Sequence, residues 1–131
     1  MKAVLAVDPG RDKCGIALVK NGAVAHREIA PRASAIAAIV SLIERHSPDV
    51  IVVGDGTGSK ALLTEIRSAT RMPIELVDET FTSQKARTRF FRENPPAGIR
   101  RLIPIGLQTP PRPYDDYVAV ILAEEYLSRN A

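Results

Sequence analysis

The sequence has a single cysteine, few histidines and no long hydrophobic run. Because Cys14 is alone among the 131 residues, a disulfide within the chain cannot form. The apolar runs are far shorter than the roughly 20 residues that cross a bilayer. The first of them, which ends at Asp8, is also too short for the core of a signal peptide. We expect one soluble cytoplasmic domain over residues 1–131, without a membrane partner.

The scarcity of histidine and cysteine also narrows the chemistry. His26 and His46 fall in different predicted elements, and neither has a metal-binding spacing to another histidine or to cysteine. Cys14 lies within a predicted strand, where a core role is favoured over a nucleophilic one. Carboxylates therefore remain as the main candidates for catalysis.

Acidic residues are scarce in one segment, residues 80–114, where Glu93 is the only acid. The net charge is +3, but this segment is strongly basic and the rest of the chain has a small acidic excess. Arginine, which pairs well with phosphate, dominates the segment, although a solvated helix face and loop would look similar. The basic residues are Lys85, Arg87, Arg89, Arg92, Arg100, Arg101 and Arg112.

The hydrophobic pattern predicts three strands followed by alternating helices and strands. Residues 2–8, 14–20 and 23–29 are predicted strands, and Asn21-Gly22 predicts a hairpin between the last two. Ile36, Ile39, Val40 and Ile43 form one helical stripe that ends before Pro48. Further strands are predicted at 50–53 and 74–77, helices at 61–70, 82–93 and 113–127, and a loop at 94–113.

This order predicts an α/β protein of the ribonuclease H-like fold. Three consecutive strands indicate an antiparallel meander, and the later alternation with helices indicates parallel strands. The expected sheet is mixed and five-stranded, with three antiparallel strands, then parallel strands, and helices on both faces.

Three acidic positions follow the carboxyl ends of strands or open a helix. Asp8 ends the first strand, Asp78-Glu79 follows the last strand, and Asp115-Asp116 begins the last helix. Sites in open α/β sheets form beyond the carboxyl ends of strands, so these carboxylates could converge. Taken singly, each acid has a structural explanation as a turn residue or helix cap. Taken together, their placement favours a metal site.

Converging carboxylates repel one another unless a cation lies between them. Magnesium and manganese prefer hard oxygen ligands. Two such ions about 3.5–4 Å apart can activate water and stabilise the leaving oxygen in phosphodiester hydrolysis. The acids therefore predict a cofactor of Mg²⁺ or Mn²⁺, with two ions expected.

Three segments of the chain resemble the YqgF/RuvX family, whose members are described as Holliday junction resolvases and as pre-16S ribosomal RNA nucleases. Residues 7–17 resemble its opening D-P-G-x-x-x-x-G, residues 77–83 its D-E-x-x-T-T segment, and residues 115–127 its C-terminal D-x-x-A-A helix. The order and spacing agree over nearly the whole chain. The resemblance implies a ribonuclease H-like nuclease with catalytic, metal-binding acids at Asp8, Glu79 and Asp115.

The resemblance leaves some positions open. Counting back from Tyr126-Leu127 favours Asp115, and Asp116 remains an alternative ligand. Gly54-Asp55-Gly56 replaces the family's usual G-L-P, so Asp55 is either an additional ligand or, as we favour, a turn residue. Thr80 stands where the family often has arginine, and Lys13 would supply the basic residue of the first loop.

The predicted function is a metal-dependent nuclease acting on structured nucleic acid, either branched DNA or precursor 16S ribosomal RNA. The basic residues of segment 80–114, with Lys13, would hold the phosphate backbone; Lys85, Arg89 and Arg92 share one helix face. The alternative is a catalytically silent nucleic-acid-binding module of the same fold. An actin-like kinase or ATPase is disfavoured because it needs a second domain. Both a monomer and a homodimer fit the sequence.

Overall fold

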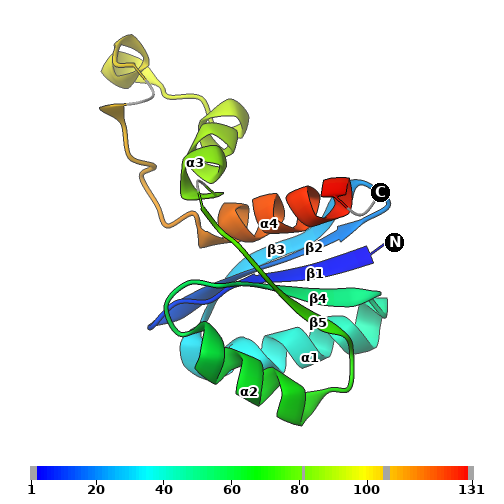
Figure 1. Ribbon diagram of the computed structural model, residues 1–131. Helices are drawn as coiled ribbons and strands as arrows, with labels where there is room; N and C mark the ends of the chain where they lie inside the picture. Colours follow the sequence, from blue (N-terminus) through cyan, green and yellow to red (C-terminus); the bar gives the residue numbers. More distant parts are fainter. Residues whose placement is uncertain (1–2, 81, 105–106, 130–131) are drawn as a thin grey trace.

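The computed structural model describes residues 3–80, 82–104 and 107–129 and contains a five-stranded mixed sheet between helices (Figure 1). The strands are β1 (Ala3–Asp8), β2 (Lys13–Lys20), β3 (Ala23–Pro31), β4 (Val50–Gly54) and β5 (Ile74–Val77). Their order is β3-β2-β1-β4-β5, which places β1 in the centre. Lys2, which we predicted to begin the first strand, and residues 105–106 of the predicted loop lie outside the described residues.

The sheet confirms the predicted ribonuclease H-like arrangement. β1 pairs with β2, and β2 with β3, in antiparallel fashion, whereas β1–β4 and β4–β5 are parallel. β1 and β4 are continuously apolar because helices cover the sheet on both faces. Asn21 and Gly22 turn the β2–β3 hairpin with φ of 53° and 81°, as that dipeptide predicts.

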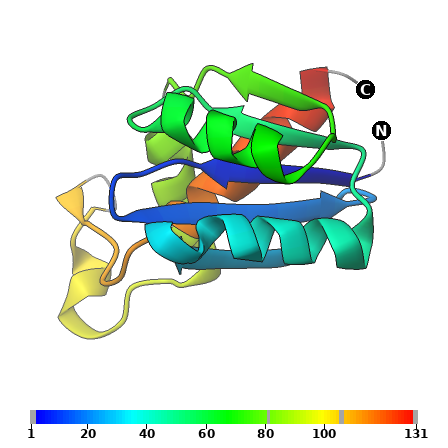
Figure 2. The same ribbon diagram turned by 90° about the horizontal axis from the view of Figure 1, so that it is seen from below.

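Helices α1 (Ala35–His46) and α2 (Ser59–Ala69) cover one face of the sheet, and α4 (Asp115–Arg129) covers the other (Figures 1 and 2). The buried stripe of α1 consists of Ala35, Ile39 and Leu42, with Ile36 and Ile43 partly buried. This stripe is rotated from the predicted one. None of the described helices is long and apolar enough to cross a membrane.

Helix α3 (Thr82–Glu93) packs against α4 (Figure 1). Its Phe90 and Phe91 meet Tyr117 and Ile121 in a small apolar cluster, with the Phe90 and Tyr117 rings edge to face. Residues 94–104 and 107–114, which connect α3 to α4, extend away from the sheet, and we call them the α3–α4 segment. It contains a short 3-10 helix, η2 (Gly98–Leu102), where we predicted only a loop.

Candidate active site

Asp8 and Glu79 meet at the edge formed by the carboxyl ends of the parallel strands. Asp8 is the last residue of central β1, and Glu79 lies two residues after β5. Because β1, β4 and β5 are parallel, their carboxyl ends share one edge of the sheet. The two carboxyl groups lie within hydrogen-bonding distance of each other.

Two glycines make room for the Glu79 side chain. A Cβ atom added to Gly54 would lie under 3.0 Å from Glu79 Oε2, and one added to Gly56 under 3.0 Å from Glu79 Oε1. The Gly54-Asp55-Gly56 segment therefore seats the carboxyl group as well as forming the turn. The Asp55 carboxylate accepts a hydrogen bond from the backbone amide of Glu79 at 3.3 Å.

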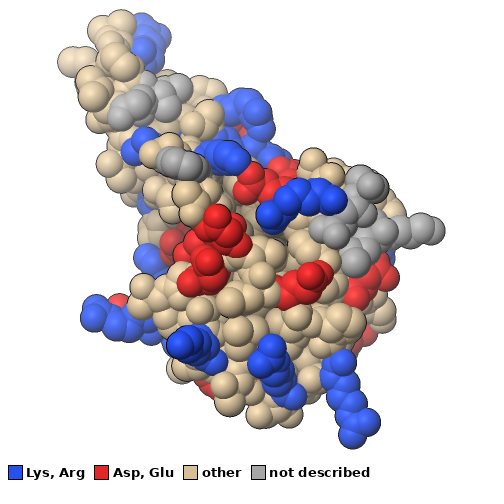
Figure 3. All heavy atoms as spheres, viewed as in Figure 1, with Lys and Arg blue, Asp and Glu red and all other residues tan. Residues whose placement is uncertain are grey.

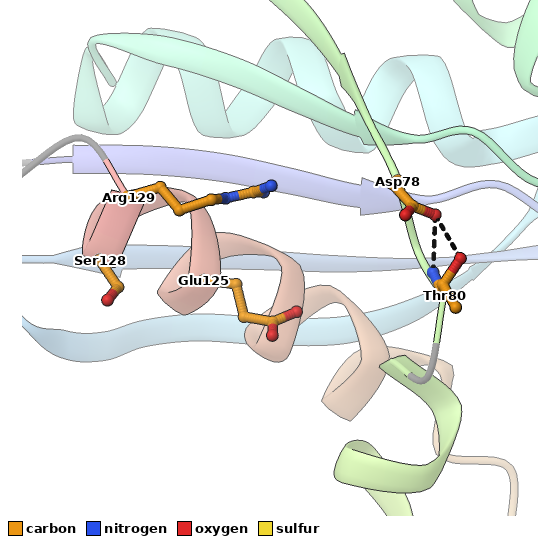
Figure 4. A pocket seen from close by; sticks show the side chains of 5 residues that line it. All are labelled: Asp78, Thr80, Glu125, Ser128 and Arg129. Atoms are coloured by element: carbon orange, nitrogen blue, oxygen red, sulfur yellow. Dashed lines mark hydrogen bonds between the residues drawn. The ribbon is translucent and has the colours of Figure 1, made fainter.

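Asp78 is turned into a different environment from Glu79. Its Oδ1 accepts hydrogen bonds from the Thr80 amide at 2.9 Å and the Thr80 hydroxyl at 2.6 Å (Figure 4). Asp78 and Thr80 line a hollow with Glu125, Ser128 and Arg129 from the last turns of α4. Of the Asp78-Glu79 pair, Glu79 is therefore the residue beside Asp8.

Asp115 approaches Asp8 from α4. It is the first residue of that helix, and its carbonyl oxygen passes so close to Gly15 of β2 that a Cβ atom there would clash with it. Lys13 Nζ lies 3.7 Å from Asp115 Oδ2. Asp8, Lys13 and Asp115 line one hollow of about 430 Å³ together with Thr57 and the β1–β2 loop.

Asp116 is held by arginines instead. Its side chain is 5% exposed, and its Oδ2 accepts a hydrogen bond from Arg27 Nη1 at 2.7 Å. Arg112 lies 3.4 Å from its other oxygen. The Arg27 guanidinium also stacks over the Tyr117 ring at 4.4 Å. These contacts engage both oxygens of Asp116, whereas Asp115 lines the hollow that contains Asp8.

The pKa values of the two carboxyl groups in contact, Asp8 and Glu79, are both raised. Burial, then the charges of Glu79 and Asp115, raise the pKa of Asp8 from its ordinary 3.8 to about 8. Burial and the charge of Asp55 likewise raise the pKa of Glu79. Without a cation, the Asp8 carboxyl therefore keeps its proton near neutral pH and shares it with Glu79.

The carboxylates suit a hard divalent cation. Glu79 Oε2 and Asp115 Oδ2 are buried and accept no hydrogen bond from any described group. Burying a charged oxygen without a partner is costly, and a cation would compensate it. In the described ranges no three acidic, histidine or cysteine side chains close around a single point as a preformed cage. The donor chemistry fits, with two carboxyls in contact and the third adjacent.

Two of the predicted phosphate-binding residues of α3 are paired with glutamates. Arg89 pairs with Glu93 and Glu124, with the latter contact at 2.6 Å, and Lys85 pairs with Glu125. The glutamates of α4 thus offset these charges, which a count along α3 alone could not reveal. Lys85, Arg89 and Arg92 do line one hollow, as the helical spacing predicts. Arg92 and Arg101 are exposed, Arg87 and Arg100 are half-buried, and Arg112 lies over the Phe90 and Tyr117 rings.

The family model described as "RuvX: Holliday junction resolvase" matches residues 2–129. The chain belongs to the RuvX family. This confirms the resemblance seen in the three acidic segments. A search of curated proteins finds no significant match.

Solved structures agree with the fold of this RuvX-family chain. T. thermophilus RuvC in complex with Holliday junction substrate gives a TM-score of 0.64 at 17% identity, covering 100% of this chain and 97% of that chain. A second Thermus thermophilus RuvC structure gives 0.58 at 18% identity, covering 98% and 96%. At these identities the likeness establishes the ribonuclease H-like fold.

Sequence reasoning did not foresee how several residues shape the candidate site. Gly54 and Gly56 make space for Glu79, and Gly15 lets the backbone of Asp115 approach β2. Arg27 holds Asp116 across a separation of 89 residues. The Gly-Asp-Gly turn was a visible signal for the first two, whereas a single arginine in β3 gave none.

Proposed function

We propose that this chain is a divalent-metal-dependent nuclease that hydrolyses phosphodiester bonds at branch points in DNA. The observation that carries the proposal is the contact between the Asp8 and Glu79 carboxyl groups, with Asp115 beside them and two buried carboxylate oxygens that accept no hydrogen bond from the described residues. The description of its family as a resolvase favours branched DNA over precursor ribosomal RNA.

Asp8, Glu79 and Asp115 would hold Mg²⁺ or Mn²⁺, in the two-ion arrangement expected from the sequence. Bound there, such ions supply Lewis-acid activation of water and of the scissile phosphate. In their absence the proton shared by Asp8 and Glu79 takes over part of the charge compensation. Loading the site therefore requires that this proton leave the pair.

The side chains around the acids would bind the nucleic-acid backbone. Lys13 Nζ, at the rim of the hollow next to Asp115, would donate a hydrogen bond to a phosphate oxygen. Arg92 and Arg101 are exposed and would add attraction that is independent of sequence. Lys85 and Arg89 would contribute less, because glutamates already pair with them.

A cleavage panel tests the proposal. Purified protein is incubated with a four-way DNA junction, single-stranded RNA or a precursor ribosomal RNA fragment, with Mg²⁺, Mn²⁺ or chelator. We expect metal-dependent cuts at the junction, which Glu79→Gln abolishes. Asp78→Asn is the matched control, because Asp78 faces Thr80 and should leave cleavage unchanged. Binding without any cleavage would support the silent module instead, and cleavage of RNA alone would replace the substrate.

A further inference from the structure

The α3–α4 segment exposes a concentration of aliphatic side chains. Of the six large apolar side chains that the described residues leave exposed, four belong to this segment: Ile99, Leu102, Ile103 and Leu107. Ile99 is 79% and Leu102 is 78% exposed, and both lie on η2. Single exposed apolar residues are ordinary, but four within one short segment, two of them on η2, mark an interaction surface.

The element that carries them is held in a defined shape. Gln108 is buried, and its Nε2 donates hydrogen bonds to the carbonyl oxygens of Arg100 at 2.7 Å and Ile103 at 2.8 Å. The Arg100 side chain donates to the Thr109 carbonyl oxygen at 3.1 Å. These bonds tie the two arms of the segment together across η2. Ile99 and Leu102 are therefore presented to solvent by an ordered turn.

The charge around η2 indicates what this surface contacts. No acidic residue occurs between Glu93 and Asp115, whereas Arg100, Arg101 and Arg112 all lie in that stretch. Figure 3 shows basic side chains on the extending segment, whereas the body of the molecule carries both acidic and basic ones. A second copy packed on η2 would bring arginines against arginines, which is unfavourable. A nucleic acid carries phosphate charges that would attract the arginines and apolar base surfaces that would contact the exposed aliphatic side chains.

The segment also extends from the active-site end of the molecule. β1 and α4 place Asp8 and Asp115 at one end of the sheet, and both views show the α3–α4 segment leaving from that end (Figures 1 and 2). A nucleic acid bound across the carboxylates would therefore pass close to the root of the segment.

We propose that η2 is an apolar wedge whose Ile99 and Leu102 insert between bases at a branch point, while Arg100 and Arg101 contact the flanking phosphates. Aliphatic side chains are known to enter base steps and unstack them, at a cost offset by the added contacts. A branch point is a suitable target because its stacking is already interrupted. This inference rests on the proposed function, because it takes branched nucleic acid as the ligand. Its new content is the way in which the branch point is recognised.

The test uses a four-way junction with 2-aminopurine, whose fluorescence rises on unstacking, at the branch point or within an arm. All measurements are made in chelator, so that no cleavage occurs. Wild-type protein should raise the branch-point signal about twofold or more and leave the arm signal unchanged. Ile99→Ser with Leu102→Ser should remove most of that rise. Binding by anisotropy should weaken only about tenfold or less, since the arginines remain.

Leu76→Ser is the matched control, because Leu76 is an exposed apolar residue on β5 outside the segment; it should behave as wild type. An undiminished rise in the double variant, or wild-type binding without any rise, would overturn the wedge and leave the nuclease proposal standing. If the wild-type protein does not bind the junction, both the wedge and the nuclease proposal are overturned. Sedimentation showing a wild-type dimer and a monomeric double variant would instead make η2 an interface between copies.

Discussion

Asp115 and Asp116 are adjacent at the start of α4, yet their carboxylates lie in opposite electrostatic settings. Asp115 lies beside Asp8 and 3.7 Å from Lys13, with a buried oxygen that accepts no hydrogen bond from the described residues. Asp116 lies 2.7 Å from Arg27 and is almost fully buried. One residue thus adds negative charge to the candidate site, while its neighbour anchors the helix.

This contrast predicts opposite effects on stability. Asp116→Asn should lower the free energy of unfolding by about 2 kcal/mol, because it leaves Arg27 and Arg112 without their shared counter-charge. Above the pKa of Asp8, about 8, where that carboxyl is ionised, Asp115→Asn should leave the metal-free protein at least as stable as wild type, because it relieves repulsion with Asp8. Urea unfolding of both variants in chelator measures this. Equal destabilisation by the two changes would count against the assignment.

The raised pKa of Asp8 predicts a pH dependence of stability. In the metal-free protein, the folded state holds the proton up to a pKa of about 8, whereas the unfolded chain releases it near the ordinary 3.8. Stability from this group is therefore full below about pH 4 and is lost as pH rises towards 8. Asp8→Asn removes the dependence, so the variant's advantage over wild type in chelator should grow between about pH 5 and pH 8.5.

Thermal melting of both proteins across this pH range measures the effect. Millimolar manganese provides the second arm, because an ion that binds only the folded state must raise wild-type stability, and should raise Asp8→Asn less. If the stability of the wild-type protein changes with pH in the same way as that of Asp8→Asn, and does not respond to manganese, the coupled carboxyl pair is refuted.

The space around Glu79 predicts a separation of activity from stability. Gly56→Ala would place a methyl group against Glu79 Oε1, and the flexible side chain can move aside, so we expect a small loss of stability and a large loss of cleavage. Gly22→Ala is the control, because Gly22 has φ of 81° and open space around it. It should cost about 1 kcal/mol through backbone strain and leave cleavage intact. Full activity in Gly56→Ala would show that the position of Glu79 is unimportant.

Most of the fold could be predicted from the sequence because it depends on local patterns. The continuously apolar β1 and β4, the Asn21-Gly22 hairpin and the alternation of helices fix the order of the elements. The carboxyl ends of parallel strands then bring Asp8 and Glu79 to one edge. The choice of Asp115 came from the family's register, since both aspartates look alike in the sequence.

The details that sequence reasoning missed depend on contacts between distant segments. The partners of Lys85 and Arg89 are glutamates on α4, which become neighbours only when α3 packs on that helix. The ordered turn of η2 depends on Gln108, whose role inside a proline-rich loop has no local pattern. Long-range side-chain pairing of this kind leaves no periodic trace in a single sequence.

The exposed arginines predict a salt-dependent contribution to binding. Charge reversal at Arg92 and Arg101 should weaken binding to all nucleic-acid sequences and make the slope of log affinity against log salt shallower. Arg71→Glu is the control, because Arg71 is exposed beside the amino end of β5, away from the candidate site. Titrations in chelator at several salt concentrations measure the slope. A slope unchanged in the double variant would assign both arginines to ordinary solvated surface.

We expect the Asp8 carboxylate to be essential to metal-dependent cleavage, and the rate of junction cleavage by Asp8→Asn measures this most directly. The amide preserves the size of the side chain but binds a divalent ion weakly. With saturating junction and manganese, we expect the rate to fall by roughly a thousandfold, in line with the several kcal/mol that metal activation contributes. Circular dichroism should show an intact fold. A folded Asp8→Asn protein that cleaves at the wild-type rate would contradict the claim.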